Sequence, residues 1–251
     1  MSPKRSDAAP EALALFTNGI LSYEQGLLAQ QRLFDERRAG RIPDAVLLLQ
    51  HRPVITLGRR GRDAGLLISR EELARRGIDL FLASRGGDIT YHGPGQWVLY
   101  PVLKLGSLEA DARGYLFNLE EIAIRTAADF GVRAFRREGM SGAWTDSGKI
   151  AAIGFHLKRW ITQHGMSFNA AVDLGGFGLI VPCGLHGEPV ASLQSILGSA
   201  RPELDSVRDR LAHHFQEVCG RRLIPVSGPD DLPDPIRDLG PILFGRSNPT
   251  T

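Results

Sequence analysis

The sequence predicts an α+β domain, in which helices pack on a mixed and largely antiparallel sheet. Segments with helical and with strand periodicity alternate along the 251 residues, without the regular strand-then-helix order of a doubly wound sheet. The composition, 43% hydrophobic and 23% charged, is that of a globular protein with a substantial core. We expect one domain over residues 11–224, a flexible arm at residues 1–10 and a Pro-rich tail at residues 225–251.

Helices are predicted where a capping residue precedes a stretch with apolar residues every three or four positions. Ser22 and Gln25 have the spacing of a capping box at the start of the first such stretch. Gly131 follows the third stretch and marks its end, because glycine readily adopts the left-handed conformation that terminates helices. The predicted helices cover residues 22–40, 69–77, 111–130 and 205–219.

Strands are predicted where short apolar or β-branched runs lie between turn residues. The runs AVLLLQ and VITLG are separated by His51, Arg52 and Pro53, which interrupt the pattern. The predicted strands cover residues 45–50, 54–58 and 96–100, and two more lie on either side of Arg159 within residues 149–174.

The composition gives no sign of a nucleic-acid or membrane partner. The formal net charge is only +2, so charge alone implies no attraction to a polyanionic surface. No apolar stretch approaches the roughly 18 residues of a membrane span. The two cysteines, Cys183 and Cys219, are too few for a disulfide framework in a chain of this size. We therefore expect a cytoplasmic protein that binds neither nucleic acid nor membrane.

The segment RGGDITYHGPGQWVLYP, residues 85–101, has four glycines around a Thr-Tyr-His step. Glycine lets the backbone approach a ligand closely, and the N–H groups of Gly86 and Gly87 could then donate to a carbonyl or an oxyanion. Glycines in this pattern also suit a hairpin, in which Tyr91 and His92 would be packing residues. The segment by itself supports both interpretations.

The segment VPCGLHGEP, residues 181–189, places Cys183 at a turn between a proline and a glycine. A nucleophilic cysteine needs exposure and a positive neighbour, because the thiolate is the reactive form. Cys219 lies near the end of an amphipathic helix, where a packing role is expected. Cys183 is therefore the candidate nucleophile of the two.

Zinc is an alternative use of the same segment. Cys183 and His186 form a Cys-x-x-His pair, and His156 and His164 precede them in the chain. A structural zinc site needs four ligands, and no second Cys-x-x-Cys motif supplies them. We therefore expect no metal at this site.

Together these segments resemble the lipoyl(octanoyl) transferase family of lipoate biosynthesis, which is related to the biotin and lipoate protein ligases. The family pattern R-G-G-x-x-T-[aromatic]-H-x-x-G-Q-x-[aliphatic]-x-Y is matched at every position of residues 85–100. Further matches follow in the family's order, GKIAAIG at 148–154, QHGMSFN at 163–169 and VPCG at 181–184. The resemblance implies a catalytic domain of the biotin/lipoate protein ligase type, which is like that of class II synthetases.

The resemblance also implies a Cys/Lys pair and an acyl-binding site. Cys183 would carry the acyl group as a thioester, and Lys149 would stabilise its thiolate and move protons. Two positions depart from the usual family pattern: Ala191 stands where a threonine is common, and Met166-Ser167 replaces a bulky apolar residue followed by alanine. The implied acyl-substrate contacts are Arg85, Gly86, Gly87, Asp88, Ile89, Thr90, Tyr91, His92, Ala152, Ile153, Gly154, Gly165, Met166 and Ser167.

The implied reaction moves an octanoyl group from acyl carrier protein to a lysine of a lipoyl domain. The acceptors implied are the lipoyl domains of 2-oxoacid dehydrogenase E2 subunits and the glycine cleavage H protein. Thioester exchange is nearly balanced and amide formation is downhill, so neither ATP nor another cofactor is implied. Candidate contacts for an acidic carrier protein are Arg59, Arg60 and Arg62, or Arg136 and Arg137.

An octanoyl chain needs an apolar slot. Burying about six methylenes at ~0.8 kcal/mol each gives roughly 5 kcal/mol, which is enough to hold the chain. The candidate walls are Trp97, Ile153, Met166 and Phe168.

Two other functions suit the same fold. An ATP-dependent lipoate or biotin ligase would use the lysine beside an acyl-adenylate and would not need Cys183. A non-catalytic acyl-binding or regulatory module would need neither Cys183 nor Lys149. The presence of both residues favours the transferase.

Overall fold

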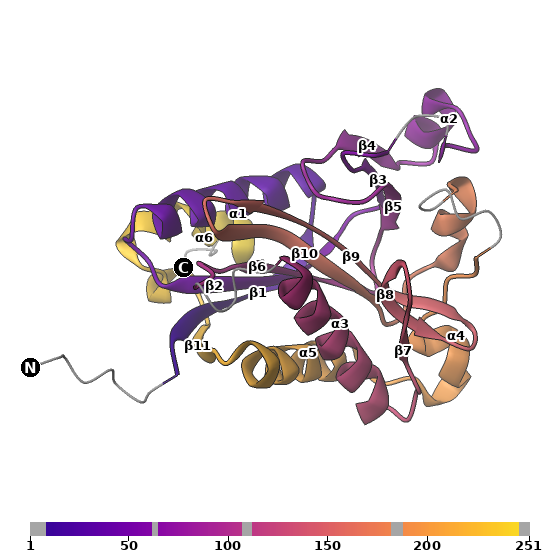
Figure 1. Cartoon of the computed structure of the whole chain (residues 1–251). Coiled ribbons are helices and arrows are strands. Elements are labelled where there is room, and N and C mark those ends of the chain that lie inside the picture. Colours follow the sequence, from indigo (N-terminus) through magenta and orange to yellow (C-terminus); the bar gives the residue numbers. More distant parts are fainter. Residues whose placement is uncertain (1–8, 62–64, 107–111, 182–187, 246–251) are drawn as a thin grey trace, which may run out of the picture.

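The computed structural model describes residues 9–61, 65–106, 112–181 and 188–245. In Figure 1 these residues form two sheets, and helices cover both faces of the larger one. The larger sheet has eight strands in the order β11-β1-β2-β6-β10-β9-β8-β7, and the smaller has three in the order β4-β3-β5. The pairs β11–β1, β1–β2 and β3–β4 are parallel, and the other pairs are antiparallel. The predicted α+β class with a mixed, largely antiparallel sheet is confirmed.

The strands of the larger sheet are β1 (Glu11–Leu21), β2 (Asp44–His51), β6 (Gln96–Val102), β7 (Phe135–Arg137), β8 (Met140–Thr145), β9 (Gly148–Lys158), β10 (Ile161–Asn169) and β11 (Arg222–Val226). The strands of the smaller sheet are β3 (Val54–Leu57), β4 (Asp79–Leu82) and β5 (Ile89–His92). The α-helices are α1 (Tyr23–Arg38), α2 (Arg70–Arg75), α3 (Ala112–Asp129), α4 (Leu193–Leu197), α5 (Leu204–Cys219) and α6 (Gly240–Leu243). Short 3₁₀ helices are η2 (Leu174–Leu179), η4 (Gly198–Ala200), η5 (Pro229–Asp231) and η6 (Asp234–Leu239).

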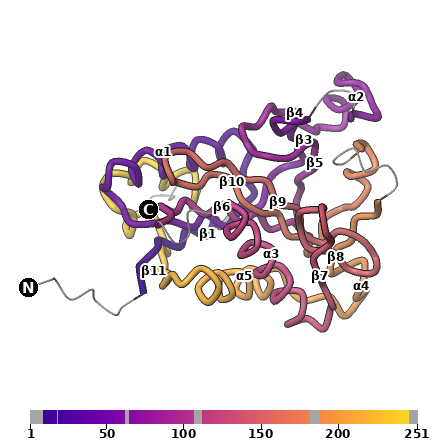
Figure 2. Tube along the Cα trace, viewed as in Figure 1, coloured from indigo at the N-terminus to yellow at the C-terminus, as the bar shows by residue number. Residues whose placement is uncertain are grey.

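The larger sheet separates two apolar layers. Helices α1 and α6 lie on one face, and α3 and α5 lie on the other, as the tube in Figure 2 also shows. Alternate residues of β2 belong to different layers, Leu47 and Leu49 to that of α1, Val46 and Leu48 to that of α3 and α5. All four side chains are fully buried. A strand covered on both faces needs apolar residues at every position, which explains its continuous apolar run.

The predicted helices are present with closely similar bounds. Ser22 caps α1, since its Oγ accepts from the Gln25 backbone N–H at 3.1 Å and Gln25 Oε1 accepts from the Ser22 N–H at 2.9 Å. This is the predicted capping box. Ser69 caps α2 through the backbone N–H of Glu72. Among the described residues, no helix is both long enough and apolar enough to span a bilayer.

The sequence analysis did not predict the short strands β4, β7 and β8 or the helix α4, and two longer segments differ from it more clearly. No strand was expected before Ser22, whereas Glu11–Leu21 forms β1 and pairs in parallel with β2 and β11. Residues 225–251 were expected as a tail outside the domain, whereas Leu232 and Leu239 are buried in the α1 layer. Prolines begin η5, η6 and α6, so the apolar residues there follow neither helix nor strand periodicity.

Candidate active site

The sequence motifs contribute to one open cleft between β5 of the smaller sheet and β6, β9 and β10 of the larger. Its empty volume is about 820 Å³, counting the space open to solvent. Gly86, Asp88 and Tyr91 are not among its lining residues, and Cys183 lies outside the described residues. The expected site residues that line the cleft are Arg85, Gly87, Ile89, Thr90, His92, Lys149, Ala152, Ile153, Gly154, Gly165, Met166 and Ser167.

The register of β9 and β10 aligns two of the sequence motifs. Residues 152–154 lie directly opposite residues 165–167, so that Gly154 faces Gly165 across the two strands. Neither glycine can be replaced without displacing the backbone beside it. A Cβ on Gly154 would lie 2.7 Å from Gly86 O, and a Cβ on Gly165 would lie 2.3 Å from Leu99 O. Both glycines therefore permit a close approach between strand and neighbouring backbone.

Arg85 holds the glycine-rich segment in place from within. Its side chain is only 7% exposed. Nη2 donates to the carbonyl and to the hydroxyl of Thr56, both at 2.7 Å, and Nη1 donates to Gly86 O at 3.0 Å. The Arg59 and Arg60 N–H groups donate to Arg85 O and Gly87 O, each at 3.1 Å. Arg85 therefore stabilises the backbone that borders the cleft.

The two glycines proposed as oxyanion donors differ in their contacts. The Gly86 N–H donates to Phe155 O at 2.9 Å, so it serves to join this segment to β9. Gly87 lines the cleft and has a φ of 85°, a conformation that side chains rarely adopt. Of the pair, only Gly87 borders the cleft.

The strand β5 divides its polar residues between its two faces. Thr90 and His92 line the cleft. Tyr91 points away, and its ring meets that of Phe177 edge-on with centroids 5.5 Å apart. Gly176 makes room for the ring, because a Cβ there would lie 2.4 Å from Tyr91 carbon atoms. Tyr91 is thus a packing residue, whereas Thr90 and His92 face the cleft.

Three buried histidines lie beside the cleft, on β2, β5 and β10, and two of them, His92 and His164, line it. Burial, with smaller contributions from His51, Arg85 and His164, lowers the pKa of His92 to about 3. Burial likewise lowers the pKa of His51 to about 4 and that of His164, which Arg85 also affects, to about 3. All three are therefore neutral near pH 7 and act as hydrogen-bonding groups. His51 Nε2 lies 3.0 Å from the Tyr100 hydroxyl.

His92 begins a chain of hydrogen bonds that reaches the strand of Lys149. His92 Nδ1 lies 2.6 Å from Gln96 Oε1, and Gln96 Nε2 donates to Asn169 Oδ1 at 2.9 Å. Asn169 Nδ2 donates to Ala191 O at 3.0 Å, and the Ala191 N–H donates to Lys149 O at the same distance. Since Gln96 presents its oxygen to His92, the His92 proton is assigned to Nδ1 and Nε2 keeps its lone pair.

Lys149 lies on β9 with its ammonium beside an aromatic ring. Its Nζ is 4.5 Å from the centroid of the Trp144 ring, and the Arg137 guanidinium carbon is 4.4 Å from the same ring. Arg137 Nη1 also donates to Glu188 Oε2 at 2.7 Å. The ring attracts cations through its negative face, so it stabilises the ammonium of Lys149 in position.

Cys183 and His186 belong to residues 182–187, outside the described residues. The chain on both sides of this segment is described. The Val181 N–H donates to Gly65 O at 2.8 Å, and the Lys149 N–H donates to Pro189 O at 2.9 Å. Pro189, six residues after Cys183 in the chain, is therefore hydrogen-bonded to the backbone of Lys149.

The candidate arginines for an acidic partner fall into two groups. Arg136 pairs with Glu120 and Glu121, and Arg137 pairs with Glu188, so their charges are locally balanced. Arg59 and Arg60 are exposed, and Arg60 lines the cleft. The third arginine of this second group, Arg62, lies outside the described residues.

Some residues around the cleft differ from the sequence-based expectations. Ile153 and Met166 line the cleft, whereas Trp97 and Phe168 are buried in the layer of α3 and α5. His51, Tyr100 and Asn169 were not proposed as site residues, although Tyr100 and Asn169 line the cleft. Their signal in the sequence is a polar residue within or at the end of an otherwise apolar strand, which needs a buried partner.

Comparison with known proteins identifies the fold and the family. A model of the lipoyl protein ligase A/B catalytic domain matches residues 22–216. A curated octanoyltransferase of Caldicellulosiruptor saccharolyticus is 43% identical over 213 residues, which cover 84% of this chain and 90% of the relative. A curated octanoyltransferase of Syntrophotalea carbinolica is 44% identical over 200 residues, 80% of this chain and 91% of the relative.

The solved structure of a bi-partite lipoate protein ligase from Thermoplasma acidophilum superposes with a TM-score of 0.64 at 15% identity and covers 93% of this chain and 91% of that one. At this identity it supports the fold alone. The sequence relatives and the matched domain extend over most of the chain, including every motif around the cleft. The chain belongs to the lipoyl protein ligase A/B catalytic domain family.

Proposed function

We propose that this protein is an octanoyltransferase that moves an octanoyl group from acyl carrier protein to a lysine of a lipoyl domain. The observation that carries the proposal is the single cleft to which three separate motifs contribute and which contains Lys149. The curated relatives are named octanoyltransferases, which supports the choice of acyl group. The acceptors on this proposal are the lipoyl domains of 2-oxoacid dehydrogenases and the glycine cleavage H protein.

In the first half-reaction, the thiolate of Cys183 attacks the carbonyl carbon of the octanoyl thioester on the carrier protein. The bond from that carbon to the carrier's sulfur breaks, and the leaving thiolate takes a proton from the ammonium of Lys149. The product is an octanoyl thioester on Cys183. The hydrogen bond between Lys149 N–H and Pro189 O supports this pairing, because Pro189 follows Cys183 by only six residues.

In the second half-reaction, the neutral amine of the acceptor lysine attacks the thioester on Cys183. The Lys149 amine, left neutral by the first step, takes a proton from the attacking nitrogen. The carbon–sulfur bond breaks, an amide forms, and Cys183 returns as a thiolate beside the Lys149 ammonium. Trp144 stabilises the ammonium form of Lys149, which is present before the first step and after the second, through its ring contact at 4.5 Å.

The apolar part of the cleft suits the acyl chain. Ile89, Val98, Ile153 and Met166 line it. Burial of about six methylenes against such a surface contributes roughly 5 kcal/mol. Gly87 is the donor candidate for the oxyanion of each tetrahedral intermediate, because its backbone borders the cleft.

The test is the intact mass of the full chain after mixing with octanoyl-acyl carrier protein. The wild-type chain should gain one octanoyl group, and Cys183→Ala should gain none. Cys219→Ala is the matched control and should keep the adduct, because Cys219 is buried at the end of α5. An adduct that persists in Cys183→Ala would remove Cys183 from the mechanism. Release of pyrophosphate from ATP with free lipoate, without any adduct, would show ligase chemistry instead.

A further inference from the structure

The last turns of α5 carry a cluster of His213, His214 and Glu217. Their candidate ligand atoms all lie within 4.8 Å of one another. Glu217 stands between the two rings: Oε1 is 3.3 Å from His213 Nε2, and Oε2 is 3.3 Å from His214 Nδ1. Residues three and four apart share a helix face, which brings Glu217 beside both histidines. The cleft is lined by other residues, so the cluster is a separate feature.

The spacing of these atoms matches that of ligands around a metal ion. Zinc ligands at about 2.0–2.1 Å in a tetrahedral arrangement lie about 3.3 Å from one another. The two separations in the cluster, 3.3 Å each, are of this size, and each involves a different oxygen of Glu217. They exceed the about 2.7–2.9 Å of a strong hydrogen bond between charged groups. With all three ligand atoms within 4.8 Å of one another, the two imidazoles and the carboxylate can converge on one ion by small side-chain rotations.

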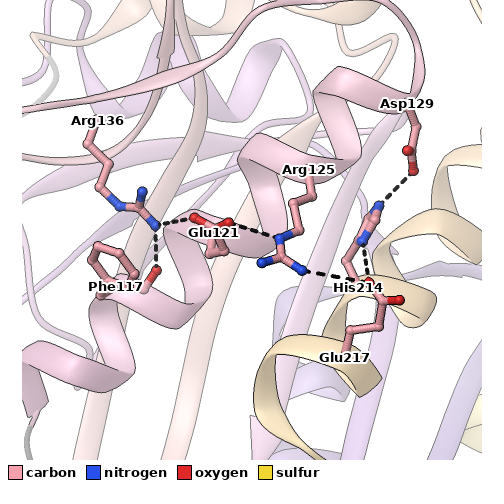
Figure 3. Close-up of polar contacts among 7 residues, drawn as sticks. All are labelled: Phe117, Glu121, Arg125, Asp129, Arg136, His214 and Glu217. Atoms are coloured by element: carbon pink, nitrogen blue, oxygen red, sulfur yellow. Dashed lines mark hydrogen bonds and ion pairs between the residues drawn. The ribbon is translucent and has the colours of Figure 1, made fainter.

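Asp129, the last residue of α3, contacts His214 on the side of the ring opposite Glu217. Asp129 Oδ2 is 2.7 Å from His214 Nε2, and Figure 3 shows the ring between this carboxylate and Glu217. A neutral imidazole that donates its proton to Asp129 keeps a lone pair on Nδ1, the atom that faces Glu217. A carboxylate in this position recurs behind metal-binding histidines, because it fixes the tautomer and the orientation of the ring.

Two arginines compete with a cation at this site. Arg210 pairs with Asp129, and Arg125 Nη1 is 3.7 Å from Glu217 Oε2. The Arg125 side chain is 45% exposed, and its Nε also donates to Glu121 at 2.8 Å, as Figure 3 shows. Arg125 can therefore leave Glu217 and keep a carboxylate partner. The cluster also lies close to the C-terminus of α5, where the helix dipole favours a cation.

We propose that His213, His214 and Glu217 bind one divalent transition-metal ion of the zinc class, with water as the fourth ligand. Two imidazole nitrogens and one carboxylate favour a late first-row ion, whereas Mg²⁺ and Ca²⁺ prefer oxygen ligands. The ligands lie on α5, and the Asp129 support lies on α3. A bound ion would therefore stabilise the contact between these helices and, through it, the folded chain.

Cobalt(II) and zinc(II) are the probes, added to the full chain purified without a histidine tag. Four-coordinate cobalt has visible absorption bands, and zinc displaces it competitively. We expect one equivalent to bind. His213→Ala and Glu217→Gln should each weaken binding by at least about tenfold, the loss seen when even the outer partner of a ligand is removed. Arg125→Gln should strengthen binding, because it removes the competing charge.

The ligand variants should fold, because the His213 and Glu217 side chains are 46% and 47% exposed; circular dichroism checks this. His156→Ala is the matched control, since it removes a histidine elsewhere, and it should bind like the wild type. Absence of binding at millimolar ion, or binding that survives both ligand replacements, would overturn the proposal. A thiolate-to-cobalt band in the near ultraviolet would place the ion at a cysteine and overturn it too.

Discussion

The cleft and the surface formed by α3 and α5 contain the same kinds of polar side chain, and most of those on the surface are far more exposed than those of the cleft. Around the cleft, His51, His92 and His164 are at most 5% exposed, and burial lowers the pKa of each to about 3 or 4. On the surface formed by α3 and α5, His213 and Glu217 have nearly half of their side chains in water. The same residue type is a neutral hydrogen-bonding group in one region and a partner of carboxylates in the other.

Cation–ring pairs show the same contrast. Lys149 Nζ lies 4.5 Å from the Trp144 ring, and Trp144 is 1% exposed. The Arg136 guanidinium lies closer to its ring, 3.6 Å from that of Phe117, but Phe117 is 51% exposed. Water screens the exposed pair, so the shorter contact need not be the stronger one. Burial, more than residue type or distance, decides what these pairs can do.

The largest expected difference between the cleft and the α3–α5 surface comes from exchanging lysine and arginine in each region. Lys149→Arg keeps the positive charge but cannot move a proton, so turnover should fall by about 10²–10⁴-fold, the usual contribution of a general acid–base group. Arg136→Lys on the α3–α5 surface should change the free energy of unfolding by less than about 1 kcal/mol. Steady-state octanoyl transfer and urea unfolding measure the two effects. Near-normal turnover of Lys149→Arg would show that Lys149 acts only through its charge.

The free energy of unfolding should decrease as the pH is lowered, because of the three buried histidines. In the unfolded chain each has a pKa of about 6.5 and binds a proton first as the pH falls. The folded pKa values are about 3 or 4, so the stabilisation is complete above pH 6.5 and is lost toward the folded values. Below pH 6.5, each histidine then lowers the free energy of unfolding by up to about 1.4 kcal/mol for every pH unit, and the three together lower it by up to about 4 kcal/mol for every pH unit.

Urea unfolding between pH 7.5 and 5 measures this slope. His51→Gln should reduce the slope by about one third, since one of the three titrating groups is removed. A free energy of unfolding that stays constant over this range would contradict the neutral, buried state of these histidines.

Removing a single hydrogen-bonding side chain should lower the free energy of unfolding more in the cleft than on the α3–α5 surface, although this difference is smaller than the effects above. His92→Leu leaves the buried Gln96 Oε1 without the partner now at 2.6 Å. The expected loss of unfolding free energy is about 1–3 kcal/mol, the cost of an unsatisfied buried acceptor. His213→Ala in metal-free buffer should change it by no more than about 0.5 kcal/mol, because the side chain is exposed. Equal losses of unfolding free energy in the two variants would contradict the difference in burial between the two regions.

Replacing Trp144, whose ring lies beside Lys149, should have the smallest of the expected effects, a moderate decrease in kcat. Trp144→Leu removes a cation–π contact that is worth up to about 2 kcal/mol when desolvated, so kcat should fall about tenfold with little change in KM. Trp144→Phe keeps an aromatic face and should recover part of the rate. Phe117→Leu, the surface counterpart, should leave kcat unchanged. A rate loss that Trp144→Phe does not relieve would indicate lost packing and not a lost ring–ammonium contact.

Local sequence signals were sufficient for the four longest α-helices, whereas most of the cleft residues came from the family resemblance. Ser22 and Gln25 cap α1 as their spacing predicts, because a capping box involves only residues within one turn. The glycine-rich motif likewise contributes Thr90 and His92 to the cleft. The sequence did not show that Tyr91 faces the other way, since a one-residue shift in the strand would reverse every side chain.

The residues themselves determined which groups are available: one lysine and one cysteine in separate motifs, glycines where backbones approach, and apolar runs for a buried sheet. Only the tertiary structure decided which of these groups meet. It brought His51, His92 and His164 together from three strands, and it placed Leu232 and Leu239 of the Pro-rich segment in the core. Periodicity and capping involve neighbours along the chain, whereas these contacts join segments far apart in sequence, and their solvation follows from everything packed around them.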